Sequence, residues 1–143
     1  MKGQKVVIIP CSGIGKSLGT VGRVATYKVT DRLRPKNTRT VCLALLTAGD
    51  SEALRLVREY PCISIDGCPA QCSKKNIEAS EGNLAHCITV TDVLRENRTL
   101  KPDGVIELNA QGNRLAEIVA TIVAEKVDEI LDKEREKNVA CQG

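Results

Sequence analysis

The chain is poor in aromatic residues: its 143 residues include two tyrosines and neither phenylalanine nor tryptophan. Proteins that bind single-stranded nucleic acid stack bases on exposed aromatic rings, so we do not expect this function here. The scarcity also leaves little with which to stack a flavin or build an aromatic interface hot spot. The formal net charge of +3 is too small to argue for nucleic acid or membrane binding.

Long hydrophobic runs are also missing. Apolar runs such as Val6 to Pro10 are short, whereas a membrane span needs about 18–20 apolar residues. The basic start, Met1 to Lys5, is followed by neither an adequate apolar stretch nor a cleavage site, so we expect no signal peptide and no membrane partner. We therefore expect a cytoplasmic protein, in which the seven cysteines do not form a secreted-type disulfide framework.

A chain of this length can bury a core of its own, and we expect a single domain over residues 1–143. Short β-branched runs predict strands, and segments with helical spacing of apolar residues lie between them. The alternation predicts a three-layer α/β fold with a mostly parallel sheet of about four strands flanked by helices. The strands are expected at 5–10, 38–42, 62–66 and 87–91, and the helices at 21–33, 51–60, 69–81 and 113–138.

The last of these helices has the clearest pattern. Asn113 is a plausible N-cap, and apolar residues from Leu115 to Leu131 fall on one stripe. Residues 132–137 are charged on all sides, so we expect these final turns to project into solvent. The sequence thus predicts a long amphipathic C-terminal helix whose stripe packs on the core. At the second helix, Asp50 or Ser51 is the expected cap.

Four cysteines share one property: each lies at or just beyond the carboxyl end of a predicted strand, where open parallel sheets bind ligands. These four are Cys11, Cys42, Cys68 and Cys72. We expect Cys62 and Cys87 to open their strands at the opposite edge as buried small hydrophobes. Either is an alternative to one of the four candidate cysteines. We expect Cys141 to lie in a frayed tail.

The segment around Cys68 and Cys72 strengthens their candidacy. Asp66-Gly67 is a turn dipeptide and Pro69 suits the first turn of a helix, which would put Cys68 near an N-cap and Cys72 one turn further on. Free backbone N–H groups at a helix start favour thiolates, and two lysines follow at positions 74 and 75. The pattern predicts a metal or redox role.

The glycine-rich segment from Cys11 to Gly19 does not match a known nucleotide motif. A phosphate-binding P-loop needs glycine where Pro10 stands, and the glycines miss the dinucleotide spacing by one residue. We expect only that this turn lets the backbone approach a ligand or a thiolate closely. His86, the single histidine, is not expected near a candidate cysteine, and we interpret Asp66 and Asp92 as turn or cap residues.

Three blocks of the sequence, in order, resemble the DGC-domain family: Pro10-Cys-Ser-Gly, Val41-Cys-Leu-Ala, and Ile65-Asp-Gly-Cys-Pro followed by Cys72 and Lys74-Lys75. The resemblance covers about residues 5–92, so residues 1–92 form a family-like core and the helix at 113–138 lies outside it. It implies four zinc-binding cysteines, which correspond here to Cys11, Cys42, Cys68 and Cys72. It implies no biochemical role, and whether the chain is an enzyme stays open.

Four functional hypotheses follow. The first is a structural zinc site formed by the four cysteines, since four protein ligands close a tetrahedral site. The second is an iron–sulfur cluster on the same thiols, for electron transfer or cluster delivery. The third is a thiol redox enzyme in which Cys68 or Cys11 is the nucleophile and Cys72 resolves it. The fourth is an adaptor that docks an acidic protein partner on the basic stretch 23–39, which holds six basic residues and one acidic residue.

Overall fold

The computed structural model describes residues 4–142 of the protein. Residues 1–3, with which the basic start begins, and residue 143 lie outside the described residues. The four strands of the sheet are ordered β2-β1-β3-β4, and every neighbouring pair is parallel. The parallel α/β sheet expected from the sequence is therefore confirmed. The strands are β1 (Val6–Pro10), β2 (Thr38–Thr40), β3 (Cys62–Asp66) and β4 (Leu84–Thr89).

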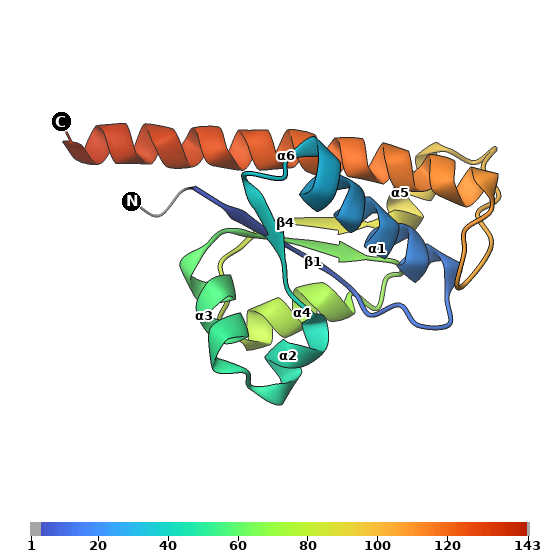
Figure 1. The fold of residues 1–143 in the computed structure, drawn as a ribbon, viewed down its shortest axis with the longest axis horizontal. Coiled ribbons are helices and arrows are strands. Elements are labelled where there is room, and N and C mark those ends of the chain that lie inside the picture. The colour runs from blue at the N-terminus through green and yellow to red at the C-terminus, as the bar shows by residue number, and fades with distance from the viewer. Residues whose placement is uncertain (1–3, 143) are drawn as a thin grey trace.

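Helices cover both faces of this sheet, as Figure 1 shows: α1, α5 and α6 lie on one face and α2, α3 and α4 on the other. The helical segments are α1 (Ser17–Lys28), the π-helical turn η1 (Val29–Leu33), α2 (Leu43–Ala48), α3 (Ser51–Glu59), α4 (Cys72–Ala79), α5 (Val90–Glu96) and α6 (Ala110–Gln142). Within residues 4–142, none of the helices combines the length and apolar character needed to cross a membrane.

The two layers of helices explain why strand β1 is apolar throughout. Successive side chains of a strand point to opposite faces, so β1 sends Val6 and Ile8 into the core beneath α1 and α6. Its alternate residues, Val7 and Ile9, pack in the second core beneath α2, α3 and α4. A strand buried on both faces needs a continuous apolar run, which is the pattern that the sequence shows.

Two strands differ from the expected ranges. β2 ends at Thr40, and the chain enters α2, which buries Leu43 and Leu46 on one face; the sequence analysis did not anticipate this short helix. β4 begins at Leu84 because that residue pairs with Cys62 across the ladder, ahead of a register shift. Cys87 therefore lies inside β4 rather than opening it, and Asp92 lies in α5 rather than after a strand.

Helix α6 carries the expected stripe but starts and ends outside the expected 113–138. Its cap is Asn109 and not Asn113, because the Asn109 side-chain oxygen accepts the backbone N–H of Gly112 at 2.7 Å. Leu131 is the last buried residue of the stripe. The turns beyond it extend past the sheet (Figure 1) and are largely exposed, as the charges at 132–137 predicted.

The connections after β1 and β3, which are adjacent strands, leave the sheet in opposite directions. β1 leads to α1 on one face and β3 leads to α4 on the other. Such a switch point leaves a crevice at the carboxyl ends of the two strands, which is where open α/β sheets bind ligands. Cys11 and Cys68 follow these two strands. The topology therefore brings two of the candidate cysteines to this crevice.

The role of α6 in the core predicts unequal effects of the same substitution at two of its valines, Val119 and Val139. Val119 is fully buried whereas Val139 is 72% exposed. Val119→Ala should lower the free energy of unfolding by about 2 kcal/mol, and Val139→Ala by less than about 0.5 kcal/mol. Urea unfolding of both variants measures the difference. Equal effects would contradict the packing of α6 on the sheet.

Candidate functional site

All four candidate cysteines lie at the carboxyl edge of the sheet, although two occupy other positions than expected. Cys11 follows β1 directly. Cys42 is the N-cap of α2 instead of the end of β2, since the strand stops at Thr40. Helix α4 begins at Cys72, so Cys68 lies in the preceding loop and not at the helix cap. All seven cysteines are free thiols.

The four cysteines line two neighbouring hollows, and one cysteine lines both. The first, which we call the thiol pocket, has a volume of about 610 Å³ and is lined by Cys11, Cys68 and Cys72 together with the glycine-rich loop 12–19. The second, the α1–β2 hollow, has a volume of about 290 Å³ and is lined by Cys11 and Cys42. Cys11 thus belongs to both hollows, whereas Cys42 does not line the thiol pocket.

The four thiols lie in the same region of the structure, but they are not arranged around a common metal position. Among residues 4–142, the side chains as they stand form no cluster of three or more Cys, His, Asp or Glu groups able to hold a metal ion. The structure thus brings Cys11, Cys68 and Cys72 to one pocket and leaves Cys42 on the far side of Cys11. Cys42 is exposed, and no hydrogen bond from its side chain caps α2.

Cys11 is the most enclosed of the four. Its backbone N–H donates to the carbonyl of Ile65 at 2.8 Å, and its sulfur accepts the backbone N–H of Gly67 at 3.4 Å. Burial raises the pKa of the Cys11 thiol, the Gly67 N–H lowers it, and the negative charges of Asp66 and of the other two pocket thiols raise it again. Cys11 is therefore a neutral thiol at pH 7 when no cation is near.

Asp66, the last residue of β3, holds the loop that carries Cys68. Its carboxylate accepts the backbone N–H of Ser73 at 2.7 Å and that of Lys74 at 3.1 Å. The interpretation of Asp66 as a cap is thus confirmed, but it caps a helix seven residues away. Burial raises the pKa of Asp66, and the two N–H groups and the lysine charges offset only part of that shift.

This cap changes what the start of α4 offers a thiolate. We expected its free N–H groups to face the cysteines, whereas the Asp66 carboxylate takes those of Ser73 and Lys74. The Ser73 hydroxyl also donates to the carbonyl of Ile9 at 2.7 Å, which ties α4 to β1. The N–H that contacts a cysteine sulfur is instead that of Gly67. The loop from Gly67 to the start of α4 passes through Gln71, which is in the left-handed conformation with a φ of 54°.

The glycines of the pocket allow its walls to approach one another. A Cβ atom on Gly19 would lie 2.3 Å from the Cα of Gly13, and one on Gly67 would lie 2.8 Å from the nitrogen of Gly19. Both distances are too short for real Cβ atoms, so the loops after β1 and β3 can meet at α1 only through glycine. These glycines therefore serve backbone packing in the walls of the thiol pocket.

The remaining cysteines and the histidine lie elsewhere. Cys62 is fully buried at the amino end of β3, and burial raises its pKa to about 12. Cys87 lies inside β4 opposite Ser64, and Cys141 is exposed near the end of α6. His86 is in β4, where burial and the charge of Lys126 on α6 lower its pKa. None of the four lines either hollow of the site.

The sequence analysis missed the partners of the site on α1. Arg23 and Tyr27 line the α1–β2 hollow with Cys11 and Cys42, but we had grouped Arg23 with the basic stretch 23–39. Their spacing of four residues, which places two side chains on one helix face, was the available signal. Within that stretch, two other arginines form ion pairs: Arg34 with Asp128 at 2.7 Å and Arg39 with Glu52 at 3.5 Å.

Comparison with known proteins gives one match. The family model described as the DGC domain matches residues 7–122, which is most of the 143-residue chain. The match includes all four candidate cysteines and runs past the three sequence blocks into the first part of α6. No curated protein and no solved structure matches the chain.

The Asp66 cap predicts a local effect of Asp66→Asn. The amide can accept one N–H of α4, but its own NH₂ group then opposes the other. Hydrogen exchange at Ser73 and Lys74 should quicken about fivefold or more, equivalent to about 1 kcal/mol of lost protection. Asp50→Asn is the matched control, because it alters the cap of α3 at Ala53 and should leave α4 unchanged. Unaltered exchange at both α4 amides would contradict this role.

Burial predicts the order in which the thiols react with iodoacetamide in folded, metal-free protein. The exposed Cys42, Cys72 and Cys141 should be alkylated first. Cys11 and Cys62, both buried with a raised pKa, should react at least about tenfold more slowly. Peptide mass spectrometry over time measures the rates. Labelling of Cys62 as fast as Cys141 would show that the core opens far more readily than its packing implies.

Proposed function

The chain belongs to the DGC domain family, and from this membership and the thiols at the sheet edge we propose that it binds one zinc ion. The ligands are Cys11, Cys42, Cys68 and Cys72. The observation that carries the proposal is the position of Cys11, which lines the thiol pocket with Cys68 and Cys72 and the α1–β2 hollow with Cys42. Cys11 therefore lies between Cys42 in one hollow and Cys68 and Cys72 in the other.

The chemistry of the donors suits zinc. Thiolate sulfur is a preferred zinc ligand, and four of them close a tetrahedral site that leaves no position for a substrate. Four thiolates and one zinc ion carry a net charge of −2, and hydrogen-bond donors and cations nearby reduce its cost. The Gly67 N–H already donates to the Cys11 sulfur, and Lys74 and Lys75 are close enough to act on the neighbouring Asp66.

Two adjustments accompany metal binding. Cys42 must turn from the α1–β2 hollow toward the other three thiols; its exposure and the absence of a side-chain cap bond leave it free to do so. Cys11 must lose its proton against a raised pKa, which the cation makes favourable. A bound ion would tie together the three loops that follow β1, β2 and β3, so its role is structural.

Zinc content and thermal stability test the proposal. Protein purified anaerobically without added metal should contain one zinc ion per chain by elemental analysis. Cys68→Ser and Cys42→Ser should each lose most of it, whereas Cys141→Ser, the matched control in α6, should keep it. Chelation should lower the melting temperature by roughly 10 °C or more, since thiolate zinc sites contribute on the order of 10 kcal/mol to folding.

Other results would contradict the zinc site and favour an iron–sulfur cluster or a redox thiol instead. A brown protein that contains iron and sulfide, and loses both in Cys68→Ser, would indicate an iron–sulfur cluster on the same thiols. Metal below one ion per chain and unaffected by Cys68→Ser would remove the metal site altogether. Rapid alkylation of Cys68 at neutral pH in that protein would then indicate a redox thiol, with Cys72 as the resolving partner.

A further inference from the structure

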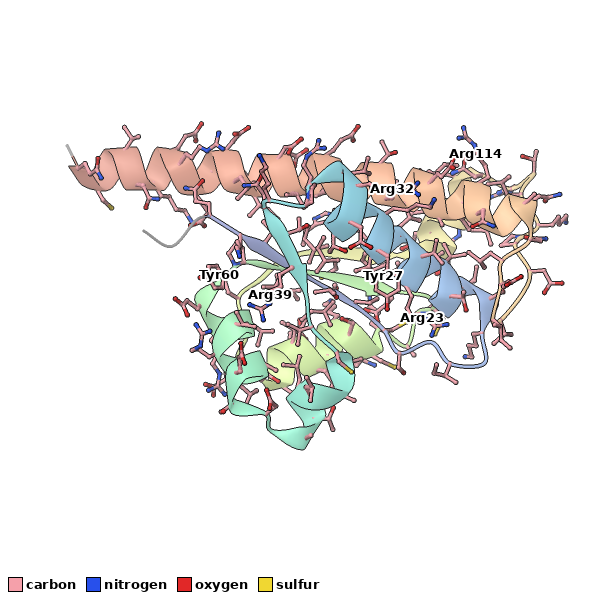
Figure 2. All side chains as sticks on the ribbon, in the orientation of Figure 1. Arg23, Tyr27, Arg32, Arg39, Tyr60 and Arg114 are labelled. Atoms are coloured by element: carbon pink, nitrogen blue, oxygen red, sulfur yellow. The ribbon has the colours of Figure 1, made fainter. Side chains whose placement is uncertain are left out.

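The α1–β2 hollow contains groups that metal binding does not require. It lies between α1, the end of β1 and the junction of β2 with α2, and Arg23 and Tyr27 enter its lining from α1. Figure 2 shows these two side chains on the same side of that helix. The lining of this hollow includes one cation, Arg23, and no acidic residue.

Arg23 has an unsatisfied guanidinium. Its Nη2 donates to the hydroxyl of Thr20 at 3.0 Å, and that hydroxyl donates in turn to the carbonyl of Val105 at 2.6 Å. Its Nε is shut off from water and has no acceptor. Among residues 4–142, no carboxylate lies within ion-pair distance of Arg23. A shielded N–H without an acceptor is costly, so Arg23 is poised to gain an anionic partner.

Arg34 shows in the same chain what such a guanidinium edge binds. Its Nε donates to one oxygen of Asp128 at 2.8 Å and its Nη2 donates to the other oxygen at 2.7 Å. This bidentate fork matches the spacing of carboxylate oxygens, and it is the arrangement for which arginine is best suited. In Arg23 the corresponding Nε lacks an acceptor, and Nη2 retains a second N–H beyond the one given to Thr20.

We propose that the α1–β2 hollow binds a small organic carboxylate, held by Arg23 and Tyr27 beside the thiols of Cys11 and Cys42. The Arg23 guanidinium turns its Nε–H toward the carboxylate, while its Nη2 continues to donate a hydrogen bond to the Thr20 hydroxyl. The Tyr27 hydroxyl supplies a further donor one helical turn away. The hollow, at about 290 Å³, lies at the small end of the range for ligand pockets, so it admits only a small molecule. The site stands without zinc.

Succinate is the probe, and the ¹⁵N-bound proton of the Arg23 Nε is the reporter. Titration of the full-length chain at pH 6, as purified and again after chelation, should move the Arg23 Nε–H resonance saturably in at least the chelated form. Succinamide, the uncharged analogue, should leave it in place. Arg23→Gln should weaken succinate binding by roughly tenfold to a hundredfold, as expected for the loss of a charged hydrogen bond.

Two variants separate the site from general charge effects. Arg32→Gln removes an arginine from the neighbouring turn η1, outside the hollow, and should bind succinate as the wild type does. Arg23→Lys keeps the charge without the fork, so it should recover only part of the affinity. Backbone spectra of each variant verify that it is folded.

Several outcomes would overturn the proposal, and they differ from failure of the zinc site. An Arg23 resonance unmoved by succinate, or moved equally by inorganic phosphate, would exclude a carboxylate site. Unchanged affinity in Arg23→Gln would place the ligand elsewhere. If Arg23→Gln lowered zinc content while succinate had no effect, the guanidinium would serve the metal-bound thiolates instead. Zinc absent from the protein with succinate still bound would contradict only the proposed function.

Discussion

The carboxylate of Asp66 is the constraint on which the site depends. It ends a buried strand and accepts two backbone N–H groups from the first turn of α4, so the loop between them has fixed ends. That loop carries Cys68 and places Cys72 at the start of the helix. The raised pKa of Asp66 indicates that burial of this charge is unfavourable. The interaction therefore orders the loop at the cost of burying a carboxylate.

Backbone packing completes what this cap begins. Gly67 follows Asp66 and lies against Gly19 of α1, while Gly13 lies against the same residue from the other side. Because no Cβ atom separates these segments, the loops after β1 and β3 meet above the switch point of the sheet. The Gly67 N–H then reaches the sulfur of Cys11. The contact at the Cys11 sulfur and the packing of these two loops on α1 are thus parts of one arrangement.

Cys11 lines two hollows whose other side chains differ in chemistry. On one side are the thiols of the thiol pocket, whose negative charges would add to that of Cys11; on the other is the hollow with an unpaired guanidinium. Thr20 connects them as well, since its hydroxyl accepts from Arg23 and donates to Val105, which lines the thiol pocket. A ligand that repositions Arg23 would therefore act on a residue of the neighbouring pocket through one shared hydroxyl.

The sequence by itself determined the layers of the fold and the edge of the site. Strand and helix periodicity depend on neighbours a few residues apart, and they sufficed for the parallel sheet, the stripe of α6 and the sheet edge near which the four cysteines lie. Only the tertiary structure decided which thiols share a hollow, what caps α4, and that the Nε of Arg23 is buried without an acceptor. Cys11 and Gly67 are 56 residues apart and Arg34 and Asp128 are 94 apart. Contacts over such separations leave no periodic trace, because they are set by how the layers pack.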